Sequence, residues 1–177
     1  MQAKSQATLY MMLGYPGAGK TTAAGIIAEL TGAVRLSSDE LRLRVFKQPA
    51  FTQAEHDAVY ATLDYLTELL LAEGVSVVYD ANLNRFEHRQ EKYDLCERTK
   101  ARPVVLWLQT SVELAKKRAV LRGHHHLVPA DETFESMFER VTNVFEPPRG
   151  QEQTIALDGT HVTKEALRPI LEKLGAL

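Results

Sequence analysis

The sequence predicts an α/β fold in which a five-stranded parallel sheet is covered by helices on both faces. Three observations predict it. Short apolar runs with strand character alternate with stretches of helical periodicity. A glycine-rich segment, GYPGAGKTT, directly follows the first run, and a long amphipathic pattern separates the second run from the third. Such alternation, with right-handed crossovers, places helices on both faces of a parallel sheet.

The predicted elements follow one another without an interrupting linker or repeat. A helix starts at Lys20 and ends at Gly32. A second long helix follows Thr52, which has capping-box spacing to Glu55, and its apolar residues recur every three or four positions. The five predicted strands are Thr8–Leu13, Ala33–Leu36, Val75–Tyr79, Pro103–Leu108 and Thr154–Leu157.

Composition limits the possible class of protein. The chain of 177 residues is 45% hydrophobic and 25% charged, which suits one globular domain spanning 1–177. The net charge of −2 gives no general attraction for nucleic acid or acidic membranes. Cys96 is the only cysteine, so no internal disulfide forms. No apolar run approaches the roughly 18 residues of a membrane span, and we expect a cytoplasmic protein.

The segment GYPGAGKTT fits the phosphate-binding pattern G-x-x-x-x-G-K-[ST]. Backbone N–H groups of such a loop cradle phosphates, the lysine reaches the β- and γ-phosphates, and the hydroxyl after the lysine binds Mg²⁺. A glycine-rich turn that binds nothing is the alternative, but the Lys-Thr pair in register favours ATP and Mg²⁺. The expected nucleotide-binding residues are Gly14, Tyr15, Pro16, Gly17, Ala18, Gly19, Lys20, Thr21 and Thr22, with Thr21 as the metal ligand.

A second candidate site lies in LSSDELRLR, after the second predicted strand. Asp39 and Arg42 are three residues apart and share a face of the first helical turns. They could form a surface ion pair, and an aspartate at a helix start also has a purely structural reason. Their place beyond the strand that follows the P-loop helix favours a role at the acceptor, with Asp39 as general base.

The third predicted strand ends in Asp80, which could hold Mg²⁺ through water or orient a substrate hydroxyl. Turn chemistry before Asn82 is the alternative interpretation. Arg85 and Arg89 lie one helical turn apart and could clamp a phosphate or the acceptor, although such spacing is also typical of a solvated basic stripe. We count Asp80, Arg85 and Arg89, with Arg42, as expected substrate-binding residues.

A further helix, capped by Ser111 and ending at Gly123, carries Arg118 and Arg122 on one face. The helix dipole also favours arginines at this end. Because a long polar segment follows, we expect a mobile lid at about 122–135 whose arginines cover a phosphate site. The adjacent His124, His125 and His126 cannot all face one ion, so lid polarity explains them better than a metal site.

These motifs together resemble a P-loop kinase of the group related to the polynucleotide 5′-kinase domain, the zeta toxins and chloramphenicol phosphotransferase. GYPGAGKTT resembles the Walker A loop, SSDELR the Asp-x-x-Arg acceptor segment, VVYDAN the strand-ending aspartate and AKKRAVLRG the arginine lid helix. The resemblance implies a P-loop NTPase fold. It also implies that Asp39 takes the acceptor's proton, Arg42 holds the acceptor, and Arg118 and Arg122 embrace the transferred phosphoryl group.

The sequence therefore predicts a kinase that moves the γ-phosphate of ATP to a hydroxyl of a small-molecule or nucleotide-like acceptor. Lys20, Asp39, Arg118 and Arg122 are its expected catalytic residues. Two alternatives stay open: a polynucleotide 5′-hydroxyl kinase, which would want an extended basic groove, and an ATPase switch that acts through a partner.

Overall fold

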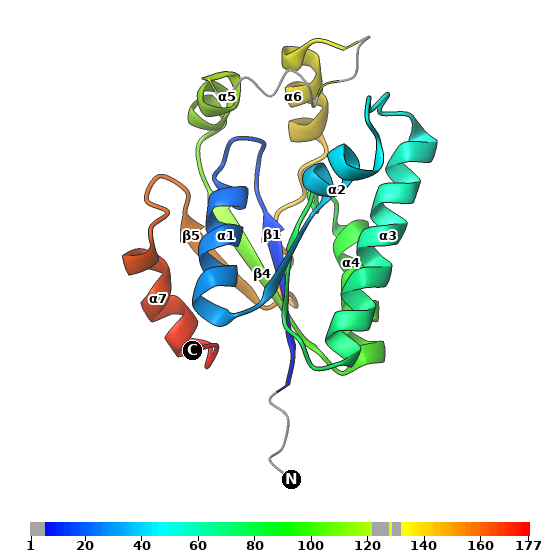
Figure 1. Cartoon of the computed structure of the whole chain (residues 1–177). Coiled ribbons are helices and arrows are strands. Elements are labelled where there is room, and N and C mark those ends of the chain that lie inside the picture. The colour runs from blue at the N-terminus through cyan, green and yellow to red at the C-terminus, as the bar shows by residue number, and fades with distance from the viewer. Residues whose placement is uncertain (1–5, 122–127, 129–131) are drawn as a thin grey trace.

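The computed structural model describes residues 6–121, 128 and 132–177, and a parallel sheet lies at its centre (Figure 1). The strand order is β2-β3-β1-β4-β5, with every neighbouring pair parallel. This confirms the predicted fold class. The strands are β1 (Thr8–Leu13), β2 (Val34–Ser37), β3 (Val77–Asp80), β4 (Arg102–Gln109) and β5 (Thr154–Asp158).

The third strand begins two residues later than the apolar run predicts. The amide of Val75 donates to the Leu70 carbonyl, so Val75 belongs to the turn that follows a helix. The hydroxyl of Ser76 accepts a hydrogen bond from the Thr8 amide, 3.0 Å away, which ties that turn to the central strand. Apolar periodicity cannot separate a strand from the apolar residues that lead into it.

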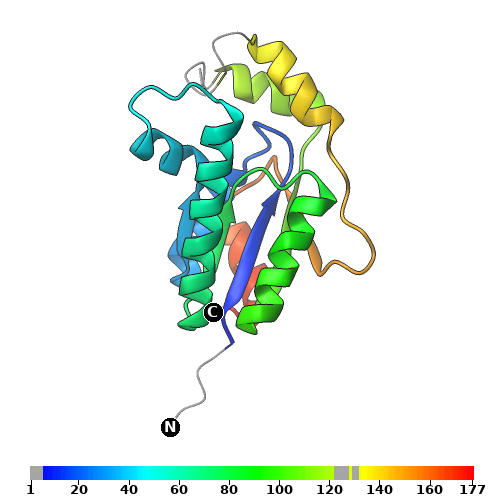
Figure 2. The same cartoon turned by 90° about the vertical axis from the view of Figure 1, so that its right-hand side faces the viewer.

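Helices cover both faces of the sheet and its carboxyl edge. Figures 1 and 2 show α1 and α7 on one face, α3 and α4 on the other, and α5 and α6 beyond the strand ends. None of the helices in the described ranges is long and apolar enough to cross a membrane. The helices are α1 (Lys20–Thr31), α2 (Ser38–Val45), α3 (Gln53–Ala72), α4 (Phe86–Thr99), α5 (Val112–Leu121), α6 (Phe134–Asn143) and α7 (Lys164–Lys173).

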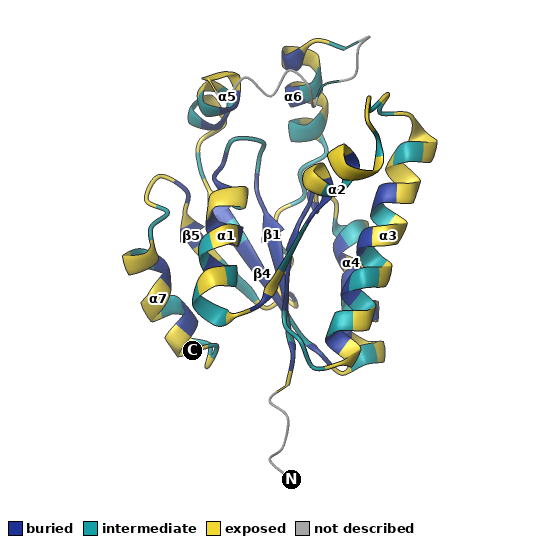
Figure 3. Cartoon of the chain, in the orientation of Figure 1, coloured by how far each residue is buried: buried dark blue, intermediate teal, exposed yellow. Residues whose placement is uncertain are grey.

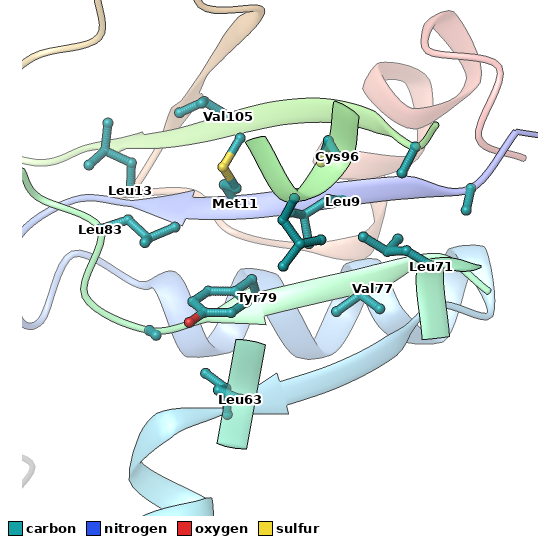
Figure 4. Close-up of a cluster of buried hydrophobic side chains, with 14 residues drawn as sticks. Leu9, Met11, Leu13, Leu63, Leu71, Val77, Tyr79, Leu83, Cys96 and Val105 are labelled. Carbon is teal, nitrogen blue, oxygen red and sulfur yellow. The ribbon is translucent and has the colours of Figure 1, made fainter. Parts of the chain in front are cut away.

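Alternate side chains of β1 enter two separate cores. Leu9 and Met11 pack with residues of α3, α4 and β3, in the cluster drawn in Figure 4. Tyr10 and Met12 point to the other face, toward α1 and α7. Successive side chains of a strand point to opposite faces, so a central strand covered by helices on both sides is apolar throughout. Figure 3 shows this burial in the central strands β1 and β3, whereas the edge strands β2 and β5 are only partly buried.

The start of α3 only partly follows its predicted capping box. The Thr52 hydroxyl accepts the hydrogen bond of the Glu55 amide, as expected for an N-cap. The Glu55 carboxylate, however, accepts from the amides of Ala50 and Phe51, at 3.0 and 2.7 Å, instead of the Thr52 amide. Glu55 therefore braces the connection from α2, where Phe51 has a positive φ of 55° that is uncommon outside glycine.

Candidate active site

The P-loop wraps around the N-terminus of α1 and needs its glycines. Gly17 has a φ of +80°, and a Cβ atom there would lie 2.1 Å from the Ala115 carbonyl oxygen of α5. Gly19 forms the N-cap of α1 with a φ of 105°. A left-handed glycine at this point turns the loop directly into the helix, whose free N–H groups and positive dipole end favour phosphate.

Lys20 is the cation of this loop. Its Nζ donates to the carbonyl oxygens of Gly14, 2.7 Å away, and Tyr15, 3.0 Å away. Burial lowers the pKa of the Lys20 ammonium from 10.5 to about 8, although the charges of Asp80 and Asp39 act in the opposite direction. Both carboxylates are thus electrostatic neighbours of the P-loop lysine, as their positions at the ends of neighbouring strands would require.

Thr21 and Asp80 lie side by side next to the P-loop and present oxygen atoms of the kind that could hold a magnesium ion. The Thr21 hydroxyl is 3.5 Å from Asp80 Oδ1, and Asp80 Oδ2 accepts a hydrogen bond from Arg35 Nε at 3.1 Å. Hydroxyl and carboxylate oxygens are the ligands that Mg²⁺ prefers, and it usually completes its shell with phosphate oxygens and water. Among the described residues, no group of three or more His, Cys, Asp or Glu side chains is placed to hold a metal ion by itself.

Asp39 lies in the first turn of α2, which is capped by the Ser37 hydroxyl. Asp39 is exposed, whereas Arg42 is buried, with only 7% of its side chain accessible. Arg42 lies against α3: its Nη1 is 3.7 Å from Glu55 Oε2 and its guanidinium is 5.0 Å from the ring centre of Phe51. Arg42 Nη1 has no hydrogen-bond partner. The two residues therefore face different surroundings within one short helix.

Arg85 and Arg89 do not form the expected clamp. Arg85 is the exposed N-cap of α4, whereas Arg89 is completely buried. Arg89 makes a two-point ion pair with Glu152, with nitrogen to oxygen distances of 2.7 and 3.0 Å. It also donates to the Leu83 carbonyl at 2.9 Å. Because its donors are used inside the protein, Arg89 joins α4 to the segment before β5, and we leave it out of the candidate site.

The arginines of the expected lid are only partly described. Arg118 on α5 donates from Nη1 to the Gly159 carbonyl oxygen, 2.6 Å away. That oxygen is 3.7 Å from the point where a Cβ on Gly19 would lie, so Arg118 is close to the P-loop. Arg122 and His124, His125 and His126 lie outside the described residues, as does most of the expected lid at 122–135.

Two residues of the site were missed by sequence reasoning. Arg35 lies on β2, and its bond to Asp80 depends on the parallel pairing of β2 with β3. Tyr60 lies on α3, and its hydroxyl accepts a hydrogen bond from the Asn82 amide at 3.3 Å. No spacing rule connects these residues. The available signal was only that each sits on an element leading to the carboxyl edge of the sheet.

A pocket of about 440 Å³ lies beside the P-loop. Three aromatic rings contribute to it, those of Tyr15, Trp107 and Phe145, and the ring centres of Tyr15 and Phe145 are 4.8 Å apart. Of the predicted site residues that the structure describes, only Tyr15 lines this pocket. Lys20, Asp39 and Asp80 do not line the pocket, but it adjoins them through Tyr15, whose carbonyl accepts a hydrogen bond from Lys20.

The strand order, the P-loop and the carboxylates at the strand ends define a P-loop kinase fold, as the sequence resemblance predicts. Residues 9–148 match the family model described as AAA domain (AAA_33), and the chain belongs to this family. No curated relative matches the chain in sequence.

Solved structures share this fold at low sequence identity. Kti12 of Chaetomium thermophilum, in complex with ADP-AlF3, is 18% identical, with a TM-score of 0.75 over 94% of this chain and 97% of its own. The APS kinase CysC of Mycobacterium tuberculosis, in complex with AMPPNP and APS, is 18% identical, with a TM-score of 0.72 and coverages of 96% and 98%. A gluconokinase of Sinorhizobium meliloti is 20% identical, with a TM-score of 0.66 and coverages of 98% and 94%.

Proposed function

We propose that the protein is an ATP-dependent kinase that transfers the γ-phosphoryl group to a hydroxyl of a small molecule. The observation that carries the proposal is the convergence of Lys20 with two carboxylates, Asp39 and Asp80, whose charges both act on its ammonium. With two carboxylates at the ends of neighbouring strands, one carboxylate can hold the metal ion and the other can act on the acceptor.

Each residue has a distinct task in this reaction. Lys20 leaves the carbonyls of Gly14 and Tyr15 and binds the β- and γ-phosphates. Thr21 and Asp80 would hold Mg²⁺, which neutralises phosphate charge when it is bound. Asp39 accepts the proton of the acceptor hydroxyl while the oxygen of that hydroxyl forms a bond to the γ-phosphorus. The bond from that phosphorus to the β–γ bridging oxygen breaks, and ADP leaves.

Arg118 would act from the opposite side of the loop, next to Gly19. Its positive charge lies on the side of β5 and α5, away from Asp39 on α2. Arg122 follows Arg118 by four residues in the sequence, and we propose that it completes the arginine pair. Positive groups around a transferring phosphoryl group stabilise the charge that develops in the transition state.

Arg42 suggests that the acceptor carries an anionic group. Its charge is only partly matched by Glu55, because the Glu55 carboxylate already accepts from two backbone amides. A buried guanidinium N–H without a partner is costly, and an acceptor carboxylate or phosphate could supply that partner. Two proteins that share the fold, an APS kinase in complex with AMPPNP and APS and a gluconokinase, are named as kinases of small molecules.

The test is an acceptor screen that follows ADP formation from ATP·Mg²⁺. The panel contains hydroxy acids, sugar acids, phosphorylated nucleosides, neutral sugars and 5′-hydroxyl oligonucleotides. Asp39→Asn keeps the shape of the side chain but is a poor proton acceptor, so we expect acceptor phosphorylation to fall at least about a hundredfold while ATP binding persists. Asp94→Asn, an exposed carboxylate on α4, is the matched control.

The outcomes separate the open alternatives. Phosphorylation of the oligonucleotides alone would replace the small-molecule acceptor with a polynucleotide end. ATP hydrolysis without phosphorylation of any acceptor would favour an ATPase switch. Near-normal transfer by Asp39→Asn would remove Asp39 from the mechanism.

A further inference from the structure

Tyr60 stands on α3 between the two segments that carry the carboxylates of the site. Its hydroxyl oxygen accepts the hydrogen bond of the Asn82 amide at 3.3 Å, and the Ser38 side chain on α2 is close enough to act on the pKa of the phenol. Asn82 follows Asp80 by two residues, and Ser38 directly precedes Asp39. One phenol hydroxyl therefore lies between the start of α2 and the turn after β3.

The surroundings of Tyr60 hold this hydroxyl in place. The ring packs against that of His56, one turn earlier on α3, with centres 4.3 Å apart and planes tilted by 31°. The neighbouring Val59 and Leu63 are buried, so this turn of the helix is anchored to the molecule. Burial raises the pKa of the Tyr60 phenol, and the charge of Asp39 adds to that rise. Tyr60 thus stays protonated at neutral pH.

We propose that Tyr60 is a positioning residue for phosphoryl transfer, holding Asp39 at a fixed separation from Asp80. The inference rests on the proposed function, in which Asp39 accepts a proton and Asp80 serves the metal side. A general base works only within hydrogen-bond reach of the proton that it removes. Because a misplacement of about 1 Å can cost about a hundredfold in rate, a contact that spans both segments matters for catalysis.

Tyr60→Phe removes the hydroxyl and keeps the ring against His56. The matched control is Tyr65→Phe, which makes the same change on the same helix at a side chain that is 63% exposed. The assay measures hydrolysis of ATP·Mg²⁺, in which water takes the place of the acceptor, so the acceptor need not be identified. We expect Tyr60→Phe to lower kcat about tenfold with an unchanged KM for ATP, and Tyr65→Phe to change neither.

Hydrogen–deuterium exchange provides a readout that does not depend on activity. The Asn82 amide loses its acceptor in Tyr60→Phe, so its exchange should become faster, while Tyr65→Phe should leave it unchanged. Unchanged exchange at Asn82 would overturn the contact itself. Faster exchange with an unchanged kcat would overturn the positioning role and leave a structural contact.

A double variant tests whether Tyr60 acts through Asp39. Once Asp39→Asn has removed the base, adding Tyr60→Phe should lower kcat no further. If the losses in kcat of Tyr60→Phe and Asp39→Asn multiply in the double variant, the inference is overturned. It is also overturned if Asp39→Asn alone leaves kcat unchanged. A wild-type protein that neither hydrolyses ATP nor transfers its phosphate would overturn the proposed function, and with it the catalytic part of this inference, whatever the exchange result.

Discussion

Arg89 and Arg42 are both buried, but the surroundings of the two arginines differ. Arg89 lies beneath the loop between β3 and α4, where Glu152 and backbone carbonyls use its donors. Arg42 lies between α2 and α3, where the nearest carboxylate oxygen is 3.7 Å away and Nη1 has no hydrogen-bond partner. Both arginines are thus buried, but Arg42 has a donor nitrogen without a hydrogen-bond partner, whereas the donors of Arg89 are used.

The carboxylate partners of the two arginines explain this difference. Glu152 is completely buried and accepts from Arg89, from the Tyr93 hydroxyl at 2.9 Å and from the Arg149 amide at 2.7 Å. This closed network serves the fold. Glu55 instead uses its oxygens on the backbone before α3, so the Arg42 region keeps unused binding capacity. A buried arginine indicates a binding site only where its donors are not already used.

The largest effect on the free energy of unfolding is expected for Arg89→Ala. Glu152 would remain buried without its counter-charge, which costs about 3–5 kcal/mol. Urea unfolding measures the loss. Arg42→Ala, the matched variant in the other region, should cost about 1 kcal/mol or less, because it removes an imperfectly bonded group. Equal losses of unfolding free energy for the two variants would show that the missing hydrogen-bond partner does not make Arg42 different from Arg89.

The next largest effect concerns binding of the acceptor. If Arg42 keeps a donor for an anionic acceptor, Arg42→Ala should raise the acceptor's KM by about 10- to 100-fold, or about 1.4–2.8 kcal/mol. The KM for ATP should not change. Steady-state kinetics with the best acceptor of the screen measures both values. An Arg42→Ala variant with normal acceptor KM would assign Arg42 to the fold, like Arg89.

Lys20 is a partly buried cation, and it should show an intermediate effect that depends on pH. Its pKa of about 8 without nucleotide means that the ammonium loses its proton as the pH rises through that value. Phosphates bind the charged form, so ATP binding takes up a proton above pH 8. Affinity should fall about tenfold, or about 1.4 kcal/mol, for each further pH unit.

Titration calorimetry in buffers with different ionisation enthalpies measures both this affinity and the proton uptake. Affinity should be nearly constant below the pKa, where Lys20 is already charged. A constant affinity from about pH 7 to about pH 9 would contradict a lowered pKa of Lys20.

The smallest effect is expected for an exposed ion pair. Arg98 contacts Glu68 at 3.1 Å, but the two side chains remain 57% and 43% exposed. Water and salt screen such a pair, so Arg98→Ala should produce no resolvable change in the urea midpoint. A loss as large as that of Arg89→Ala would show that contact geometry, and not burial, controls the strength of these pairs.

The elements nearest the P-loop could be predicted well because they depend on contiguous residues. The bounds of β1 agree with the apolar run Thr8–Leu13, and α1 ends at Thr31, with the expected Gly32 as its C-cap. The spacing of Arg85 and Arg89 suggested a clamp for a phosphate or the acceptor, or a solvated basic stripe, but Arg89 is buried and bonded to Glu152. A period in the sequence shows which residues share a helix face, but not whether that face meets solvent or a buried glutamate.

Local sterics and periodicity specify the α/β alternation, the glycine conformations of the P-loop and the register of Lys20 and Thr21, so these features can be derived from the order of the residues. The partners of the buried charges depend on how distant segments pack. Arg35 and Asp80 are 45 residues apart, and Arg89 and Glu152 are 63 apart. These pairs, like the Tyr60 contact with Asn82, form where strand order and helix packing bring distant segments together, and no local pattern encodes that order.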